Sequence, residues 1–254
     1  MSKVRVRSVE APRPMPWLLL AAFALALAAT IGITGVAWAQ DAEEPAESAA
    51  AEEPTEDDGG NDAGGIDGTW AVNTGIGSFE GTDELDPFSG TWVGFRVAEV
   101  LRNIGDAEAV GRTPDVSGEL VATGSTIESA IIEVDLTGIR SDQSRRDPWI
   151  QDALDTSSFP AATFESSGPV DLGAVPVDGE PFVATVPGAL TIRGVSQDVE
   201  LEMQGQRVGD VVLVVGELPI DFTEFDVTMP VLGPVVSVED DGSLEWQLFL
   251  ERQG

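Results

Sequence analysis

The sequence contains no histidine and no cysteine. These two absences exclude a Ser-His-Asp triad, a thiol nucleophile, a structural zinc site, and the haem and iron–sulfur ligand sets built on the same side chains. Carboxylates are abundant, but abundance alone assigns no acid–base pair. The sequence therefore predicts that the protein is not an enzyme, and it predicts no catalytic residue, no cofactor and no metal site.

Positive charge is also scarce. The chain has 13 Lys and Arg against 45 Asp and Glu, which gives a formal net charge of −32. A surface this negative repels phosphate backbones, so nucleic acid is excluded as a partner. The same imbalance argues against an anionic ligand held by charge.

The basic residues near the start precede an uncharged apolar run over residues 17–39. As a helix of roughly 23 residues, this run would extend about 34 Å, enough for a hydrocarbon core of about 30 Å and longer than the usual signal-peptide core. We therefore expect a transmembrane signal-anchor at 17–39 and a basic cytoplasmic tip at 1–16. The basic residues of the tip are Lys3, Arg5, Arg7 and Arg13.

Cleavage is the alternative, because Ala37-Trp38-Ala39 fits a small-x-small site and would release a secreted protein after Ala39. In both cases the positive-inside rule exports the chain from Gln40 onward. The expected location is the cell membrane, with a single pass and an extracytoplasmic domain.

Residues 40–65 are expected to form a disordered acidic linker. Positions 41 to 62 hold ten acidic residues and no Lys or Arg. Such a segment cannot bury enough apolar surface to offset its ordering entropy, and its charges repel one another. It would hold a domain formed by residues 66–254 away from the membrane.

In residues 66–254, short runs of alternating apolar residues recur between Gly, Pro and Asp turns. The positions between them include Glu133, Glu200, Glu245 and Gln247, so each strand is expected to bury only the apolar face. Without long amphipathic helices, this pattern predicts an all-β antiparallel sandwich or barrel. The apolar runs are Val93, Phe95 and Val97; Ala130, Ile132, Val134 and Leu136; Ala162 and Phe164; Leu190 and Ile192; Val199, Leu201 and Met203; Val211, Leu213 and Val215; and Leu244, Trp246, Leu248 and Leu250.

Two local patterns interrupt the strands. Asp147 followed by Pro148 combines a helix N-cap acid with proline at the first helical position, which predicts a short helix over about 148–154. Asp240-Asp241-Gly242 predicts a hairpin turn before the final strand.

Three blocks of sequence resemble the YceI-like family of bacterial polyisoprenoid-binding proteins, and their order and separation match that family. They are Ser141 to Asp147, Phe159 to Ser166 and Gly188 to Val195. Gly68 to Val72 fits the family's first strand, so the resemblance covers roughly residues 66–252. It implies a lipocalin-like antiparallel β-barrel with a long apolar tunnel that takes up an isoprenoid or another lipid chain.

The chain departs from the family pattern at two places. Ala98 and Glu99 stand where many members carry histidine after the Phe-x-Val strand, and Phe222 stands in place of an arginine. These departures indicate a divergent exported branch, whose ligand need not be that of the better-known members.

The resemblance implies a set of inward apolar residues that line the tunnel; from the residues alone, packing of a small barrel explains the same set. Arg145 and Arg146 are candidates for a polar clamp at the barrel mouth, with an ion-paired loop as the alternative. The tunnel candidates are Val93, Phe95, Phe164, Phe222, Phe225, Leu244 and Trp246.

Three functions remain open at this point. A membrane-tethered carrier of a lipid or isoprenoid is expected first, a structural or adhesive cell-envelope domain without a ligand second, and a hydrolase that uses only carboxylates, Ser and Arg third. They differ in the interior that they require. The carrier needs an apolar tunnel, the structural domain a packed core, and the hydrolase a cleft with two convergent carboxylates. The sequence sets no expectation for the oligomeric state.

Overall fold

The computed structural model describes residues 65–77, 90–231 and 233–254. The described residues all fall within one compact unit. The tip at 1–16, the apolar run at 17–39 and nearly all of the linker at 40–65 lie outside the described residues, so those assignments stay predictions. Within the described part, no helix has the length and apolarity needed to cross a membrane.

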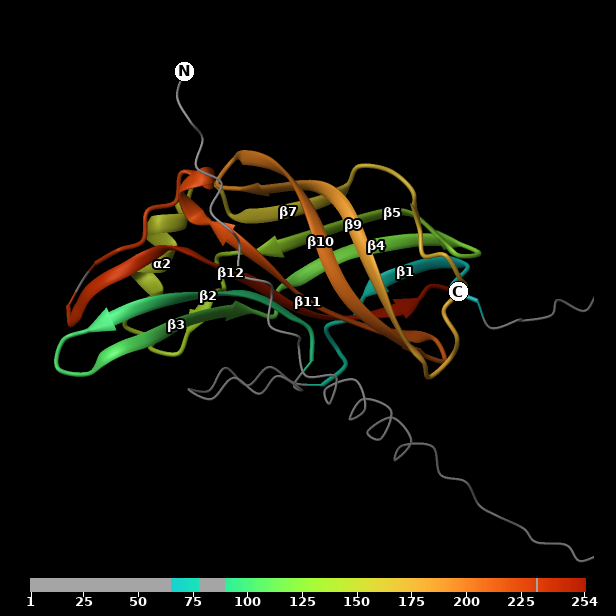
Figure 1. Ribbon diagram of the computed structural model, residues 1–254, viewed down its shortest axis with the longest axis horizontal. Helices are drawn as coiled ribbons and strands as arrows, with labels where there is room; N and C mark the ends of the chain where they lie inside the picture. Colours follow the sequence, from blue (N-terminus) through green and yellow to red (C-terminus); the bar gives the residue numbers. More distant parts are fainter. Residues whose placement is uncertain (1–64, 78–89, 232) are drawn as a thin grey trace, which may run out of the picture. The chain divides into compact units, whose positions relative to one another are not determined.

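Antiparallel strands close into a barrel (Figure 1), which confirms the barrel expectation. Eight strands follow one another around it, and β1 pairs with β12 to complete the ring. In order around the barrel they are β1 (Gly68–Val72), β4 (Val116–Thr123), β5 (Thr126–Asp135), β7 (Ala161–Ser166), β9 (Pro181–Ile192), β10 (Val195–Val208), β11 (Val211–Asp221) and β12 (Val235–Arg252).

The long strand β12 has two neighbours on the same side. Its last residues pair with β1, whereas Val235 to Gln247 pair with β2 (Trp92–Leu101), which is followed by β3 (Gly105–Thr113) and β6 (Arg140–Ser141). The short strand β8 (Val170–Asp171) pairs with β5.

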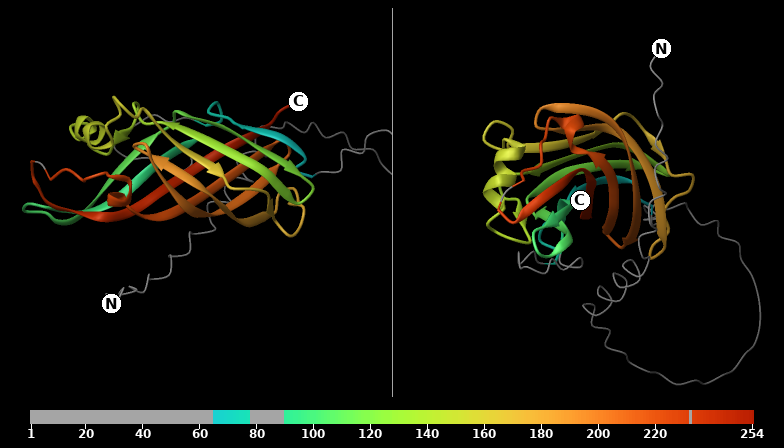
Figure 2. Two further views of the ribbon diagram at one scale, coloured as in Figure 1. Left: turned by 90° about the horizontal axis from the view of Figure 1, so that it is seen from above. Right: turned by 60° about the vertical axis from the view of Figure 1, so that its left-hand side comes forward.

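The two short helices, α2 (Asp147–Leu154) and η1 (Phe222–Phe225), lie at the end of the barrel where β2 and β3 turn (Figure 2). We call this the α2 end, and the end near the C-terminus the opposite end.

The helix predicted over 148–154 is confirmed, but the predicted cap is wrong. The helix begins at Asp147, the N-cap position is Arg146, and no side chain caps the helix. Asp147 instead accepts hydrogen bonds from the backbone N–H and the hydroxyl of Ser141, at 2.8 and 2.6 Å. Its carboxylate therefore fastens the helix to β6.

The predicted hairpin turn at Asp240-Asp241-Gly242 is also wrong. These residues lie inside the continuous strand β12. The pairing with β2 shifts there, because Val238 pairs with Glu99 and Gly242 pairs with Val97. The extra residues form an irregularity of the bulge type, which accommodates an Asp-Asp-Gly sequence without ending the strand.

The expectation of one buried face fails for β11. Val212 and Val214 join the interior cluster, and Leu213 and Val215, on the outer face, are equally buried. The run Val211 to Val215 is apolar at every position, so alternation could not show which face turns inward.

The outer face of β12 was expected to be exposed at Glu245 and Gln247, and this expectation is wrong, because both side chains are largely buried. Glu245 accepts hydrogen bonds from Arg96 at 2.8 Å and from Arg112 at 3.3 Å, and Arg112 stacks on the ring of Trp92. The hydrogen bond to Glu245 raises the pKa of Arg96, whereas burial lowers the pKa of Arg112. Gln247, beside them, donates to the carbonyl of Gly90 at 2.7 Å and is buried.

Candidate functional site

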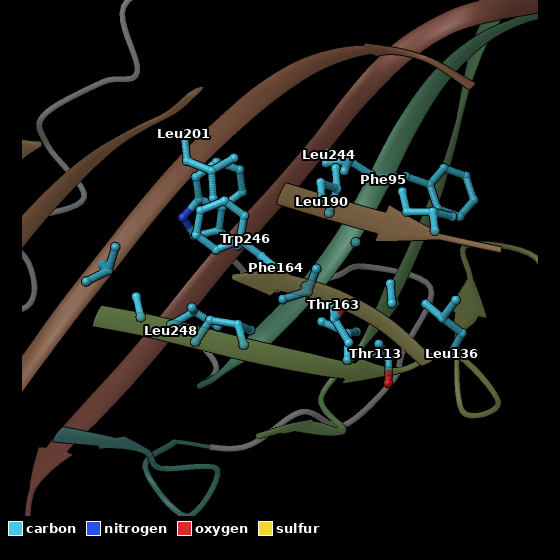
Figure 3. Close-up of a pocket in the computed structure, with 18 of the residues that line it drawn as sticks. Phe95, Thr113, Leu136, Thr163, Phe164, Leu190, Leu201, Leu244, Trp246 and Leu248 are labelled. Atoms are coloured by element: carbon cyan, nitrogen blue, oxygen red, sulfur yellow. The ribbon is translucent and has the colours of Figure 1, made fainter. Parts of the chain in front are cut away.

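The barrel interior contains an apolar cavity of about 160 Å³. Its lining comes from strands β2, β3, β4, β5, β7, β9, β10, β11 and β12, from α2 and from Phe222 of η1. Side chains from strands far apart in the sequence point toward the same space (Figure 3). Among the described lining residues, polar groups are limited to the hydroxyls of Thr113 and Thr163 and the indole N–H of Trp246, so the cavity offers a ligand apolar contact, no charge and little hydrogen bonding.

Glycines set the width of the cavity beside its large aromatic residues. Trp246 lies directly opposite Gly216 on β11, and a Cβ atom at Gly216 would lie 2.1 Å from Trp246 Cζ2. Phe95 is paired with Gly111 in the same way, and a Cβ atom there would lie 2.5 Å from the ring. Each ring therefore lies against the neighbouring strand at its glycine, and the centre of the barrel stays open.

Phe164 repeats the arrangement on β7. A Cβ atom at Gly188 of β9 would lie 2.4 Å from Phe164 Cζ. Phe222, at the α2 end, packs edge-to-face against Phe95 with 6.1 Å between ring centroids. The arginine expected there from the family pattern is thus replaced by part of the apolar lining.

The volume of the cavity limits what it holds without movement. An engineered apolar cavity of about 150 Å³ stays dry and binds a single benzene molecule. One five-carbon isoprene repeat is of that size, whereas sites for larger organic ligands occupy about 300–1,000 Å³. Longer chains therefore require the lining to move apart along the barrel.

The structure brings six of the seven tunnel candidates together around the cavity. They are Val93, Phe95, Phe164, Phe222, Leu244 and Trp246. Phe225 is almost completely buried in the core but is not part of the lining. Their role in ligand binding stays a prediction.

Other lining residues were not among the candidates. Leu120 of β4 and Val186 of β9 line the cavity, and so does Leu154 of α2. Their sequence surroundings resemble those of ordinary core residues, and only the strand register shows that they face the same space. No local pattern in the sequence distinguishes them.

A buried ion pair lies at the α2 end. Glu99 sits near the end of β2 with its side chain only 3% exposed, and Arg146 Nη2 lies 2.7 Å from its Oε1. Arg146 Nη1 lies 3.7 Å from Asp142. Arg146 thus belongs to an ion-paired loop, the alternative considered for it, whereas Arg145 is exposed. The two candidates for a polar clamp are not brought together.

The opposite end is filled by Trp70, whose ring is 1% exposed. Its Nε1 donates to the carbonyl of Ile66 at 2.7 Å, and Arg252 lies over its ring at 4.6 Å from the centroid. At the α2 end the cavity reaches Ile139, Leu154 and Ile192. The cavity thus extends to the helix α2, while a fully packed tryptophan occupies the other end of the barrel.

We compared the chain with models of known protein families, and one family matches. A family model described as a YceI-like domain matches residues 84–250. No curated protein matches the chain.

A solved structure with a TM-score above one half has a similar fold. The chain is similar to a polyisoprenoid binding domain from Saccharophagus degradans implicated in plant cell wall breakdown, with a TM-score of 0.54 and 20% identity over 64% of this chain and 94% of that one. Burkholderia cenocepacia BcnA gives a TM-score of 0.47 and 21% identity, over 62% of this chain and 95% of that chain. A YceI protein of Campylobacter jejuni gives a TM-score of 0.47 and 17% identity, over 57% of this chain and 85% of that chain.

The contact between Gly216 and Trp246 yields a first prediction. Gly216→Ala should lower the free energy of unfolding by about 1–3 kcal/mol, because the added methyl group overlaps the indole and forces it toward the cavity. The loss caused by Gly216→Ala should be smaller when the substitution is made in a Trp246→Leu chain than in the parent, since the overlapping ring is gone. Gly168→Ala is the control, because its Cβ atom would meet nothing within 4 Å. Urea unfolding of the parent, the three single variants and the double variant measures these effects, and equal stability of the Gly216→Ala and Gly168→Ala variants would contradict the account.

The two neighbouring arginines yield a second prediction. Arg146→Met should lower the free energy of unfolding by about 3–5 kcal/mol at neutral pH, because it leaves the buried carboxylate of Glu99 without its cation. Arg145→Met, at an exposed position, should change it by no more than about 0.5 kcal/mol. Thermal and urea unfolding distinguish the two variants. Similar losses for both would show that Arg146 does not stabilise the α2 end through Glu99.

Proposed function

The chain belongs to the family of YceI-like domains, and from this membership and the apolar cavity we propose that its barrel binds an isoprenoid or another long apolar chain. The observation that carries the proposal is the uncharged lining, which runs through the barrel as far as α2. The similar domain from Saccharophagus degradans is described as polyisoprenoid-binding. Binding without chemistry fits a lining that contains no carboxylate, amine or guanidinium.

Affinity in such a site comes from apolar area, at about 25 cal/mol for each Å² removed from water. The ligand's apolar chain lies inside, and any polar headgroup stays outside the lining or meets the hydroxyls of Thr113 and Thr163. Because the cavity holds about one isoprene repeat as it stands, a longer ligand widens it as it enters. The relevant ligand is therefore a flexible chain rather than a rigid, polar molecule.

The small volume is the one observation that favours the second function, a structural or adhesive envelope domain without a ligand. A barrel that never opens would serve that role. The two functions differ in whether the interior admits an apolar chain, and filling the cavity decides between them.

A matched pair of substitutions provides the test. Ala162 lines the cavity, so Ala162→Leu fills part of it and should weaken binding of geranylgeraniol about tenfold or more. Ala98 is exposed on β2, and Ala98→Leu should leave the affinity unchanged. Intrinsic tryptophan fluorescence follows the titration, with Trp246 in the cavity wall as the reporter.

The outcome is clear in each direction. Loss of affinity in the cavity variant alone supports the carrier function. Binding of geranylgeraniol by neither the parent nor the variants, or equal binding by all three, would reject the cavity as the site.

Export and membrane tethering complete the proposal. The basic tip at 1–16, the uncharged run at 17–39 and the acidic segment that follows support a barrel held outside the cell membrane. Protease added to intact cells should release residues 66–254 by cutting the acidic segment. Protection of the domain until the cells are lysed would refute this topology, and a mature chain that begins at Gln40 would replace the anchor by a cleaved signal peptide.

A further inference from the structure

Two apolar protrusions lie together at the α2 end. The turn between β2 and β3 carries Ile104, which is 74% exposed. Val231, before β12, is 53% exposed, and Val236, the second residue of β12, is 54% exposed. The backbone N–H of Arg102 donates to the carbonyl of Pro234 at 2.8 Å, so the two segments are joined. Both extend beyond the rest of the barrel at this end (Figure 2). We call Ile104, Val231 and Val236 the apolar tip.

The sequence around the apolar tip is unusual for this chain. Residues 227–238 contain no charged side chain, although 23% of the whole chain is charged. In the hairpin formed by β2 and β3, the turn is flanked by one positive charge, Arg102, and one negative charge, Asp106. The next carboxylates on β12, residues 239–241, lie further back at the irregularity opposite Val97 and Glu99. Apart from Arg102 and Asp106, the charge that follows along β12 begins behind the apolar tip.

The opposite end shows the contrast. Val175, Val177 and Val183 are exposed there as well. They lie within or beside a loop that also contains Asp178 and Glu180. Exposed apolar side chains there are mixed with carboxylates of one sign, whereas at the apolar tip residues 227–238 carry no charge and the hairpin beside them carries one charge of each sign.

A tryptophan stands directly behind the apolar tip. Trp149 of α2 is partly exposed, and its Cη2 lies 3.9 Å from the position that a Cβ atom would take at Gly233. Tryptophan with one apolar side and one wet side is enriched at the level of lipid headgroups. The order of apolar residues, then tryptophan, then charge, matches a segment that enters a membrane surface from one side.

We propose that the apolar tip docks into the surface of a lipid bilayer. The inference rests on the proposed function, because a long apolar chain taken up by the cavity is dissolved in a bilayer before it is bound. Docking would bring α2 to the membrane, and Leu154 of that helix lines the cavity. The exposed side chains of the apolar tip protrude singly and form no groove into which a folded partner could fit. Such side chains can insert between the lipids of a fluid bilayer.

The charge of the protein specifies the bilayer. At a net charge of −32 the chain is repelled by anionic headgroups. Docking is therefore strongest on zwitterionic phosphatidylcholine and weakens as anionic lipid is added. The attraction comes from the apolar side chains, so added salt should not abolish it.

The absence of cysteine makes a local experiment possible in the full chain. Ile104→Cys and Val236→Cys each place one environment-sensitive fluorophore at the apolar tip, and Val183→Cys places it at the opposite end, where the side chain is 71% exposed. Phosphatidylcholine vesicles with brominated acyl chains should quench the tip labels by about half or more, since interfacial side chains reach about 5–10 Å into the acyl boundary. The control label should stay nearly unquenched. Every chain keeps its N-terminal segment, so membrane attachment through that segment is common to all of them, and two chains with the same label differ only in the tip.

Ile104→Glu combined with the Val236 label should remove most of the quenching, because a carboxylate is expensive to insert. Equal quenching at tip and control, or none at the tip, would overturn the proposal. Titration of the same chains with geranylgeraniol in vesicle-free solution tests the cavity separately. Quenching at the tip without binding of geranylgeraniol would support membrane docking and reject the proposed ligand. Binding of geranylgeraniol without quenching would support the ligand and reject membrane docking.

Discussion

The cavity exists because three aromatic rings lie against glycines instead of against one another. Trp246 rests on Gly216, Phe95 on Gly111 and Phe164 on Gly188, and in each pair a Cβ atom at the glycine would overlap the ring. Side chains of this size would otherwise fill a barrel of eight strands. Glycine in a strand normally weakens it, but here the ring covers the bare backbone and restores the lost packing. The open, apolar interior depends on this arrangement.

In the described part of the barrel, charged groups are kept away from the cavity lining. The buried pair of Glu99 and Arg146 lies at the α2 end, and Glu245 with its two arginines lies on the outer face. Because charge is excluded from the lining, any ligand is selected by shape and apolar area, and the ion pairs hold the surrounding elements in place. A similar separation continues outward at the α2 end, where the apolar tip precedes the carboxylates of β12.

Patterns along the chain predicted the fold class, the short helix and, through the family resemblance, the lipocalin-like barrel. Alternation worked where one face is polar, as in β5, and failed in β11, where Val211 to Val215 are apolar throughout. It gave no strand at β3, whose Gly, Ala, Asp and Glu residues have weak strand propensity and which is held by pairing to β2. The pairing of aromatics with glycines, and of Glu99 with Arg146, joins residues distant in sequence and needs the register. Six tunnel candidates surround the cavity because they lie on well-alternating strands or on the adjoining η1.

Mass spectrometry of an organic extract tests the central claim most directly, using the full-length chain purified without added lipid. An apolar interior that opens for a flexible chain should retain one, so the extract should contain an isoprenoid or another long-chain lipid in an amount approaching one molecule per protein. An extract with no more lipid than that of an unrelated protein purified in parallel, from a chain that also takes up none when offered, would contradict the account. The barrel would then be a structural domain with a small closed cavity.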